Sequence, residues 1–432
     1  MLPSELSRVM FYARFVKKLE VYNTGPRLIG YFLVLLAKAL QGRILLLNIE
    51  YLIWNPDDDY EFPFIHAFLG PNIRRLIISL TGMGGYAASS RLSDTYKWNL
   101  PETYPSLVSF QMDDYDYDYD YHANPAIITT ASHMICGWAH LQVVAVNNLT
   151  PAAFEYLASL PSLRELSLSD IRDISPLPDP APTPESGLFP ALQGLVVTYN
   201  RPDIGIALLQ TVTCAPLVRL SITCPCDAEH GRHLLKTLLT CRAAYNSLQS
   251  LAIYSSERPY LSTFIESDIT PAALSTESLR NVFAFTNLLD VELEIAGGFD
   301  MDDAELEEMA RAWRRLECLS LRTRAADPGQ HSRLTLRALV ILARECQALV
   351  VLDIEYLDAT MDALNVARVF AGGRPMVNKH VQSINIRHSP IDDIQQVSLF
   401  LRTIFTGLEV IAGTSWRREM SGMDQATNSE DS

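Results

Sequence analysis

At residues 349–354 the chain reads Leu349-Val350-Val351-Leu352-Asp353-Ile354, with apolar side chains at the first, fourth and sixth positions. This pattern recurs along the 432-residue chain at intervals of about 30 residues. Such regular recurrence indicates one repeated structural unit rather than chance. The copies begin at Val16, Ile44, Ile73, Leu107, Leu141, Leu163, Leu192, Leu217, Leu248, Leu288, Leu316, Leu349 and Val381, with a degraded copy at Leu408.

Side-chain alternation in a short strand sends the fourth and sixth positions of each copy into a core and the residues between them to the opposite face. Helical segments separate the strands: Asp302 and Glu305 predict a capping box, and Thr150 and Thr335 predict two further helix starts. No single unit of this kind can bury its apolar face alone. We therefore predict an α/β leucine-rich-repeat solenoid of about 13–14 repeats over residues 1–413, with a curved parallel sheet inside and helices outside.

The composition limits the class of protein. Apolar residues make up 48% of the chain and charged residues 20%, which suits a large folded core. The net charge of −15 repels phosphate backbones, and we find no concentrated basic patch, so we expect no nucleic-acid partner. The seven dispersed cysteines indicate reducing conditions rather than a disulfide framework.

Two further features bear on location. Residues 28–37 form the longest apolar run, which is too short to span a bilayer and predicts a buried helix. The N-terminus lacks the basic-then-apolar layout of a secretion signal. We expect a soluble protein without membrane contact, in the cytoplasm or nucleus.

Four segments interrupt the repeats. Alternating prolines at 175–184 predict an extended polyproline spacer, with recruitment of a proline-reading domain as the alternative. Alternating Asp and Tyr at 113–121 predict a solvated loop; the alternatives are an acidic, aromatic contact for a basic partner or weak calcium binding. The widest step holds an insertion at 255–270, and the polar tail at 414–432 is predicted to be disordered.

Motifs for chemistry are weak. Gly82–Ala87 matches a relaxed dinucleotide fingerprint, but no good helix start follows it. Cys224, Cys226, His230 and His233 are close in sequence, but one residue between the cysteines suits a tetrahedral zinc site poorly. We find no nucleophile elbow. We therefore predict no catalytic, metal-binding or cofactor-binding residues and no enzymatic activity.

The turn before the quoted strand carries a family resemblance. In 342–354 a helix ends at Cys346 and the next strand motif starts three residues later, and Cys214 has the same spacing before Leu217. We interpret both thiols as small buried side chains that close the turn. The repeat pattern, with cysteine at these two turns, resembles the cysteine-containing leucine-rich repeats of F-box proteins. These proteins are the substrate-receptor subunits of cullin-based ubiquitin ligases. The resemblance covers the chain from about residue 11 to 411.

The chain departs from that family at its start. An F-box would precede the repeats, but the first strand motif begins at Val16, and only residues 2–6 echo an F-box opening. The resemblance implies a non-catalytic scaffold that binds a protein partner of unknown identity, as a substrate-recognition region does. It implies a ubiquitin-ligase adaptor subunit as partner only if an F-box exists outside this chain. A free-standing leucine-rich-repeat adaptor is the alternative, and a nucleotide-binding enzyme a distant third.

The sheet face opposite the core is the candidate partner-binding site. Its outward positions alternate between acidic and basic strands, which suits either cross-strand charge pairing or an electrostatically patterned partner surface. Ser320 and Asn385 are also expected to point outward. The predicted partner-binding residues are Asp290, Glu292, Glu294, Arg322, Asp353, Glu355, Arg387 and Tyr254.

Overall fold

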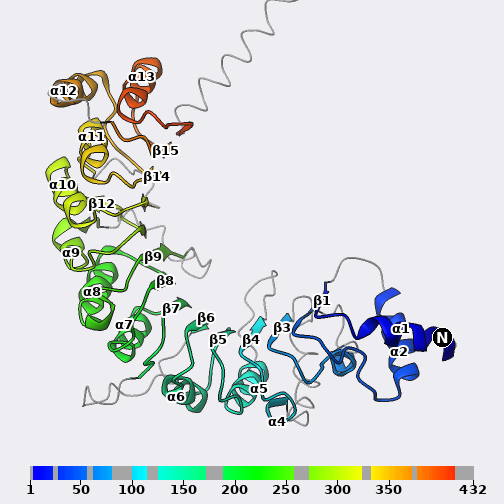
Figure 1. Ribbon diagram of the computed structural model, residues 1–432. Coiled ribbons are helices and arrows are strands. Elements are labelled where there is room, and N and C mark those ends of the chain that lie inside the picture. The colour runs from blue at the N-terminus through cyan, green and yellow to red at the C-terminus, as the bar shows by residue number, and fades with distance from the viewer. Residues whose placement is uncertain are drawn as a thin grey trace, which may run out of the picture. The chain divides into compact units, whose positions relative to one another are not determined.

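The computed structural model is an α/β structure with a long parallel sheet of 14 strands that does not close into a barrel, which is consistent with a solenoid (Figure 1). The strands follow one another in the sheet in chain order, and β10 and β12 form a separate pair. No helix among the described residues is long and apolar enough to cross a membrane. The structure describes residues 3–22, 28–55, 62–79, 100–113, 125–171, 188–256, 272–323, 332–371 and 377–413.

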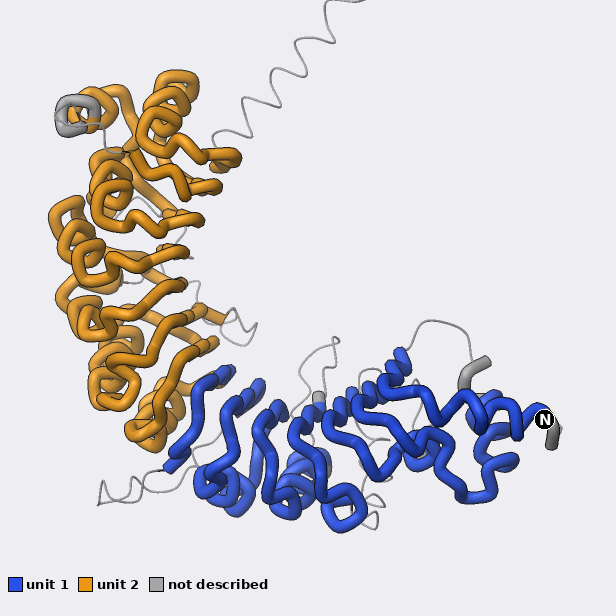
Figure 2. The backbone as a smooth tube through the Cα atoms, in the orientation of Figure 1, with its two compact units in different colours: residues 1–198 blue, residues 199–432 orange. Residues whose placement is uncertain are grey.

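The chain divides into two compact units, residues 1–198 (unit 1) and 199–432 (unit 2) (Figure 2). The strands of unit 1 are β1 (Lys18–Val21), β2 (Tyr51–Trp54), β3 (Arg75–Ser79), β4 (Ser109–Asp113), β5 (Val143–Val146), β6 (Glu165–Ile171) and most of β7 (Gly194–Tyr199). Its helices are α1 (Pro3–Ala13), α2 (Leu28–Leu40), η1 (Phe62–Ala67), α4 (Leu100–Thr103), α5 (Pro125–Ile135) and α6 (Pro151–Ser159).

In unit 2 the helices lie along one side of the parallel strands (Figure 1). The strands are β8 (Arg219–Cys224), β9 (Ser250–Ser255), β11 (Asp290–Ile295), β13 (Cys318–Thr323), β14 (Val351–Ile354), β15 (Ser383–Asn385) and β16 (Val410–Ala412), with the short pair β10 (Leu274–Ser275) and β12 (Phe299–Asp300). The helices are α7 (Pro202–Thr211), α8 (Ala228–Leu238), η3 (Arg242–Ala244), α9 (Thr276–Arg280), α10 (Asp303–Ala312), α11 (Leu336–Glu345), α12 (Met361–Ala371) and α13 (Ile394–Ile404).

Strands occur at every predicted copy of the six-residue pattern except the copy at Ile44, and β16 follows the degraded copy at Leu408. From the copy at Ile73 to the copy at Val381 the fourth and sixth positions lie in the core, as Leu352 and Ile354 show at 1% exposure each. In the first copy Leu19 and Val21 are only half-buried. The first position closes the turn: the amide of Leu349 donates to the carbonyl of Cys346 at 3.1 Å. The predicted helix starts are also confirmed, including the capping box at Asp302.

The predicted second strand is wrong by five residues. Strand β2 begins at Tyr51, so the pattern is occupied by Ile49, Leu52 and Trp54, each fully buried. Leu47, which the predicted copy would place in the core, is 49% exposed. Apolar residues are so dense at 44–54 that two registers fit the pattern, and only packing distinguishes them.

The helix predicted at 28–37 is present as α2, but it is not wholly buried. Leu33 and Leu36 face the core, whereas Phe32 and Leu35 are 52% and 39% exposed. The prediction for the two turn cysteines is half right: Cys346 is buried, but Cys214 is exposed. Ala215 fills the corresponding place, because its amide closes the turn onto Val212 instead.

The interpretations of residues 82–87, 114–121, 175–184, 257–270 and 414–432 concern segments outside the described residues.

Candidate functional site

The strand face of unit 2, opposite the buried positions of the pattern, carries one connected charged network. We define the strand face as Tyr254, Asp290, Glu292, Glu294, Cys318, Ser320, Arg322, Asp353, Glu355 and Arg387. The parallel register places Glu292 beside Ser320 and Ser320 beside Asp353 on the successive strands β11, β13 and β14. Neighbouring strands are about 4.8 Å apart, so the side chains of this row lie within reach of one another.

Arg322 joins three carboxylates in the middle of the strand face. Its Nη2 donates to Glu292 at 3.2 Å, and its guanidinium nitrogens lie 3.9 Å from carboxylate oxygens of Glu294 and Asp353. The hydroxyl of Tyr254 donates to Glu292 at 2.9 Å, and its ring centroid lies 5.8 Å from the Arg322 guanidinium carbon. One internal cation therefore bridges strands β11 and β14.

A second arginine continues the network. Arg387 donates two hydrogen bonds to Asp353, at 2.8 and 2.7 Å, and its Nε lies 3.9 Å from Glu355. His388 Nδ1 lies 2.6 Å from the same glutamate. Glu355, predicted to face outward, is only 8% exposed because these neighbours cover it. The structure thus places all eight predicted residues on one face and adds His388, which sequence reasoning missed because alternation from Ile384 and Ile386 assigns position 388 to the core side.

The strand face has an excess of negative charge: its five carboxylates outnumber its two guanidiniums. Burial, followed by nearby carboxylates, raises the pKa of the Cys318 thiol to about 11. Burial and the hydrogen bond to Glu292 raise the pKa of Tyr254 to about 12. Burial, with Glu317 and Glu292 nearby, also raises the pKa of Asp290. Burial is the largest cause of each shift, and the neighbouring carboxylates add to it.

Two buried polar atoms on the strand face have no hydrogen-bond partner among the described residues. They are the hydroxyl oxygen of Ser320, a residue only 4% exposed, and the Nε of Arg322. Ser320 stands between Glu292 and Asp353 in the register, so its hydroxyl lies on the acidic side of the sheet. Buried polar groups in folded proteins usually form hydrogen bonds. Two such atoms without one, on Ser320 and on Arg322 two residues later, therefore mark this part of the strand face as a candidate binding site.

The cluster around Cys224 is buried rather than open. Cys224 and Cys226 are buried, and His230 Nε2 lies 3.2 Å from the Tyr199 hydroxyl. The neighbouring Cys226 thiol, and then His230, lower the pKa of Cys224. His233 faces solvent on α8, away from this cluster. Within the described residues, no group of three His, Cys, Asp or Glu side chains is arranged to hold a metal ion.

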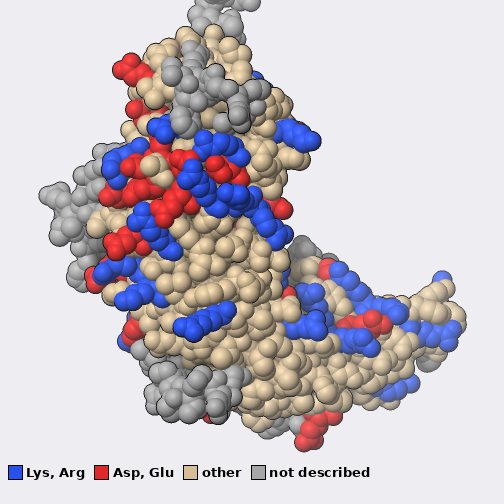
Figure 3. Space-filling model, turned by 60° about the vertical axis from the view of Figure 1, so that its left-hand side comes forward, with Lys and Arg blue, Asp and Glu red and all other residues tan. Residues whose placement is uncertain are grey.

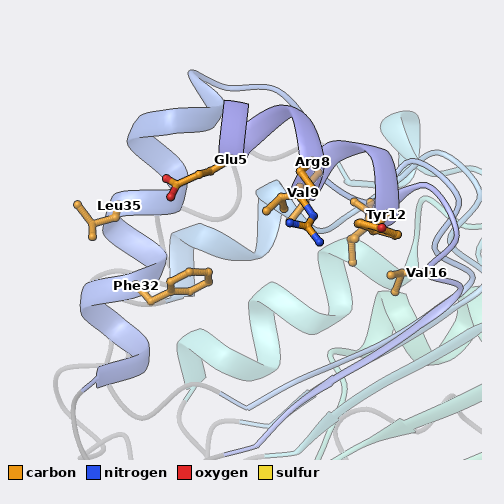
Figure 4. Close-up of a pocket in the computed structure, with 10 residues that line it drawn as sticks. Glu5, Arg8, Val9, Tyr12, Val16, Phe32 and Leu35 are labelled. Carbon is orange, nitrogen blue, oxygen red and sulfur yellow. The ribbon is translucent and has the colours of Figure 1, made fainter. Parts of the chain in front are cut away.

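A groove of about 760 Å³ lies between α1 and α2 in unit 1 (Figure 4). Val9 and Tyr12 line it from α1, and Phe32 and Leu35 line it from α2. These four side chains are between 37% and 57% exposed. The lining is largely apolar, which suits packing against another apolar surface rather than recognition of a charged group.

On the helix side of unit 2, acidic and basic side chains form local pairs. Acidic and basic side chains are interleaved there (Figure 3). Arg280 and Glu308 form a salt bridge at 2.8 Å, and Arg344 pairs with Glu307. Opposite charges neutralise one another within these pairs, whereas the strand face keeps a surplus of carboxylates. The strand face is therefore the stronger candidate for recognising a charged partner.

Comparison with models of known protein families gives no match, and the curated proteins include no similar sequence.

Proposed function

We propose that the protein is a non-catalytic leucine-rich-repeat scaffold that binds a protein partner through the strand face of unit 2. Its closest functional analogy is the substrate-recognition region of an F-box subunit of a cullin-type ubiquitin ligase, working in the cytoplasm or nucleus. The observation that carries the proposal is the strand face itself, where hydrogen bonds and ion pairs join seven of the eight predicted residues into one partly exposed network and Asp290 lies on the same face.

The repeat architecture supports this proposal. Parallel strands in chain order, most of them separated by helices, present a row of side chains that does not contribute to the core. In the copies of unit 2 from Leu217 to Val381 the fourth and sixth positions are committed to packing, so the outward positions are free to vary with the partner. Solenoids commonly bind partners on such extended surfaces.

The chemistry of the face supports recognition rather than catalysis. Its arginines are held by carboxylates, its tyrosine hydroxyl is hydrogen-bonded, and the pKa of its thiol is raised, which lowers its nucleophilicity. Partly buried charges and an aromatic ring give specificity in protein interfaces.

The test is affinity capture from an extract of the source cells with three versions of the full chain. The Glu292→Gln/Asp353→Asn variant alters the strand face, and the Glu229→Gln/Glu308→Gln variant removes the same charge from the helix side. We expect at least one protein to be retained by the wild type and the helix-side variant but lost from the strand-face variant. Identical sets of retained proteins would overturn the proposal. Thermal unfolding verifies that all three are folded.

The ligase connection has its own readout. If the retained proteins include a cullin and its adaptor subunit, the scaffold belongs to a ubiquitin ligase. If a substrate-like partner is retained without them, the free-standing adaptor is the correct interpretation.

A further inference from the structure

We propose that the strand face contains a cation subsite, formed by Ser320, Glu292 and Asp353, that receives a lysine side chain of the partner and is occupied in the free protein by Arg322. This inference rests on the proposed function and specifies the partner's chemistry.

The geometry of Arg322 shows what the subsite can hold. A single guanidinium lies 3.2 Å from Glu292 and 3.9 Å from Asp353, two strands apart in the sheet. One cation at this place therefore contacts both carboxylates. Arg322 is an imperfect occupant, since its buried Nε makes no hydrogen bond.

Ser320 supplies the second, independent observation. Its hydroxyl is buried, lies between the two carboxylates in the register and makes no hydrogen bond within the part of the chain that the structure describes. Leaving such a group unsatisfied costs folding stability, so a ligand that pairs with it gains binding energy. An ammonium has three donors in a compact group. The three donors match one oxygen each from Ser320, Glu292 and Asp353. A planar guanidinium from the partner would instead leave a donor unpaired, as the guanidinium of Arg322 does.

The net charge of the strand face determines the sign of the charge that the ligand must carry. Five carboxylates against two arginines attract a cation, and the raised pKa values of Cys318 and Asp290 have the same origin in part. A partner lysine that enters would displace Arg322 toward solvent, where its guanidinium regains hydration. Arg322 thus acts as an internal competitor that a correct partner must replace.

The test measures binding of fluorescein-labelled hexalysine by anisotropy at physiological salt, where exposed charges more than about 8 Å apart are largely screened. Removal of the competitor in Arg322→Gln is expected to tighten binding by about tenfold. The matched control Arg280→Gln, which also removes one positive charge, should bind as the wild type does. Glu292→Gln/Asp353→Asn should lose binding, and Glu229→Gln/Glu308→Gln should keep it.

Ser320→Ala gives a second readout that a structural role would not produce. In the Arg322→Gln background it should weaken hexalysine binding several-fold and at the same time raise the melting temperature, because an unsatisfied buried hydroxyl is removed. A variant that only unfolds the sheet would lower both the hexalysine affinity and the melting temperature.

Three results would overturn the inference. One is Arg322→Gln binding hexalysine no more tightly than Arg280→Gln. Another is hexalysine binding that survives Glu292→Gln/Asp353→Asn. The third is wild-type binding of hexaglutamate that Arg322→Gln abolishes, which would make Arg322 the receptor for an anionic partner. In each case affinity capture from the cell extract tests the proposed function separately. Its result depends on whether a partner binds the strand face, and not on the sign of the ligand's charge.

Discussion

Arg387 donates two hydrogen bonds to Asp353 on the neighbouring strand, at 2.8 and 2.7 Å, and Arg322 approaches the same carboxylate to 3.9 Å. Asp353 is therefore shared between two arginines, one held tightly and one held loosely. Its side chain is 16% exposed, so both arginines interact with it away from bulk water. This asymmetry explains why Arg322, and not Arg387, is the arginine that a partner would displace.

Replacing Arg387 should weaken the sheet modestly. Arg387→Ala should lower the free energy of unfolding by about 1 kcal/mol, since cross-strand charge pairs contribute about 0.2–1 kcal/mol and Asp353 loses its main partner. A double-mutant cycle with Asp353→Ala measures the coupling by urea unfolding. A coupling energy near zero would contradict the assignment of this pair as stabilising. Arg387→Lys should recover part of the loss because it keeps the charge but not the two-point geometry.

Trp313, the aromatic residue in the turn before β13, should contribute strongly to the stability of this repeat. Trp313 is fully buried and its carbonyl accepts the amide of Leu316 at 3.0 Å. Trp313→Ala should cost about 3–5 kcal/mol, because a large cavity opens beneath β13. Leu399→Ala, at a residue of the same unit that is 64% exposed, is the surface control and should change stability by less than about 0.5 kcal/mol. Equal effects of the two substitutions would refute the packing argument.

The sequence predicts the repeat well because one signal is read many times. A single copy of the pattern is weak evidence, but copies at regular intervals reinforce one another, and nearly all coincide with strands. The failure at Ile44 arises where leucine and isoleucine are so dense that a shift of five residues preserves the pattern. Cys214 failed for a related reason, because the turn before Leu217 is closed by Ala215 and the sequence does not show which of two adjacent small residues faces inward.

Turn-closing aromatics escaped prediction although a signal was present. The residue three positions before the strand motif is a buried aromatic in several repeats: Tyr104, Trp138, Phe189, Phe285, Trp313 and Phe405. Aromatic residues are commoner at this position than the two cysteines, and the sequence alone shows it.

The capping box at Asp302 gives a third prediction. The Asp302 carboxylate accepts from the amides of Ala304 and Glu305 at 3.0 and 2.9 Å, and the Glu305 carboxylate accepts from the Asp302 amide. Asp302→Ala should lower the free energy of unfolding by about 1 kcal/mol. Asp302→Asn, which retains an acceptor, should lose much less. Similar losses for both variants would show that the side chain acts through its charge rather than as a cap.

Asp290 gives a prediction with a pH dependence. Its pKa is raised above the usual 3.8, first by burial and then by Glu317 and Glu292. The folded state therefore binds this proton more tightly than the unfolded state, and stability falls as pH rises through the interval between the two pKa values. At neutral pH the penalty is complete, so Asp290→Asn should raise the free energy of unfolding there, by less than about 1 kcal/mol.

The gain from Asp290→Asn should vanish when the pH falls below about 3.8, where the wild-type carboxyl is protonated in both states. Urea unfolding at neutral and acidic pH measures it, with Glu229→Gln as the exposed control. A gain independent of pH would mean that the substitution acts through packing.

Sequence alternation predicted which side chains share the strand face, but it did not predict the contacts between them. Alternation within β11, β13 and β14 placed Glu292, Arg322 and Asp353 on one face without any three-dimensional information. Which carboxylate each arginine contacts depends on side-chain conformations across strands, and these follow from packing. The unpaired hydroxyl of Ser320 is likewise visible only when its neighbours are in place.

Protection of Cys318 tests the central claim most directly. This thiol lies on the strand face beside Asp290, whereas Cys214 is exposed in the turn before β8 and serves as an internal control. The measurement is the rate of iodoacetamide alkylation at each cysteine, by mass spectrometry, in the free protein and in complex with the partner retained by affinity capture. If the partner binds the strand face, Cys318 should react several-fold more slowly in the complex while Cys214 reacts at the same rate. Unchanged alkylation of Cys318 in a saturated complex would contradict the account.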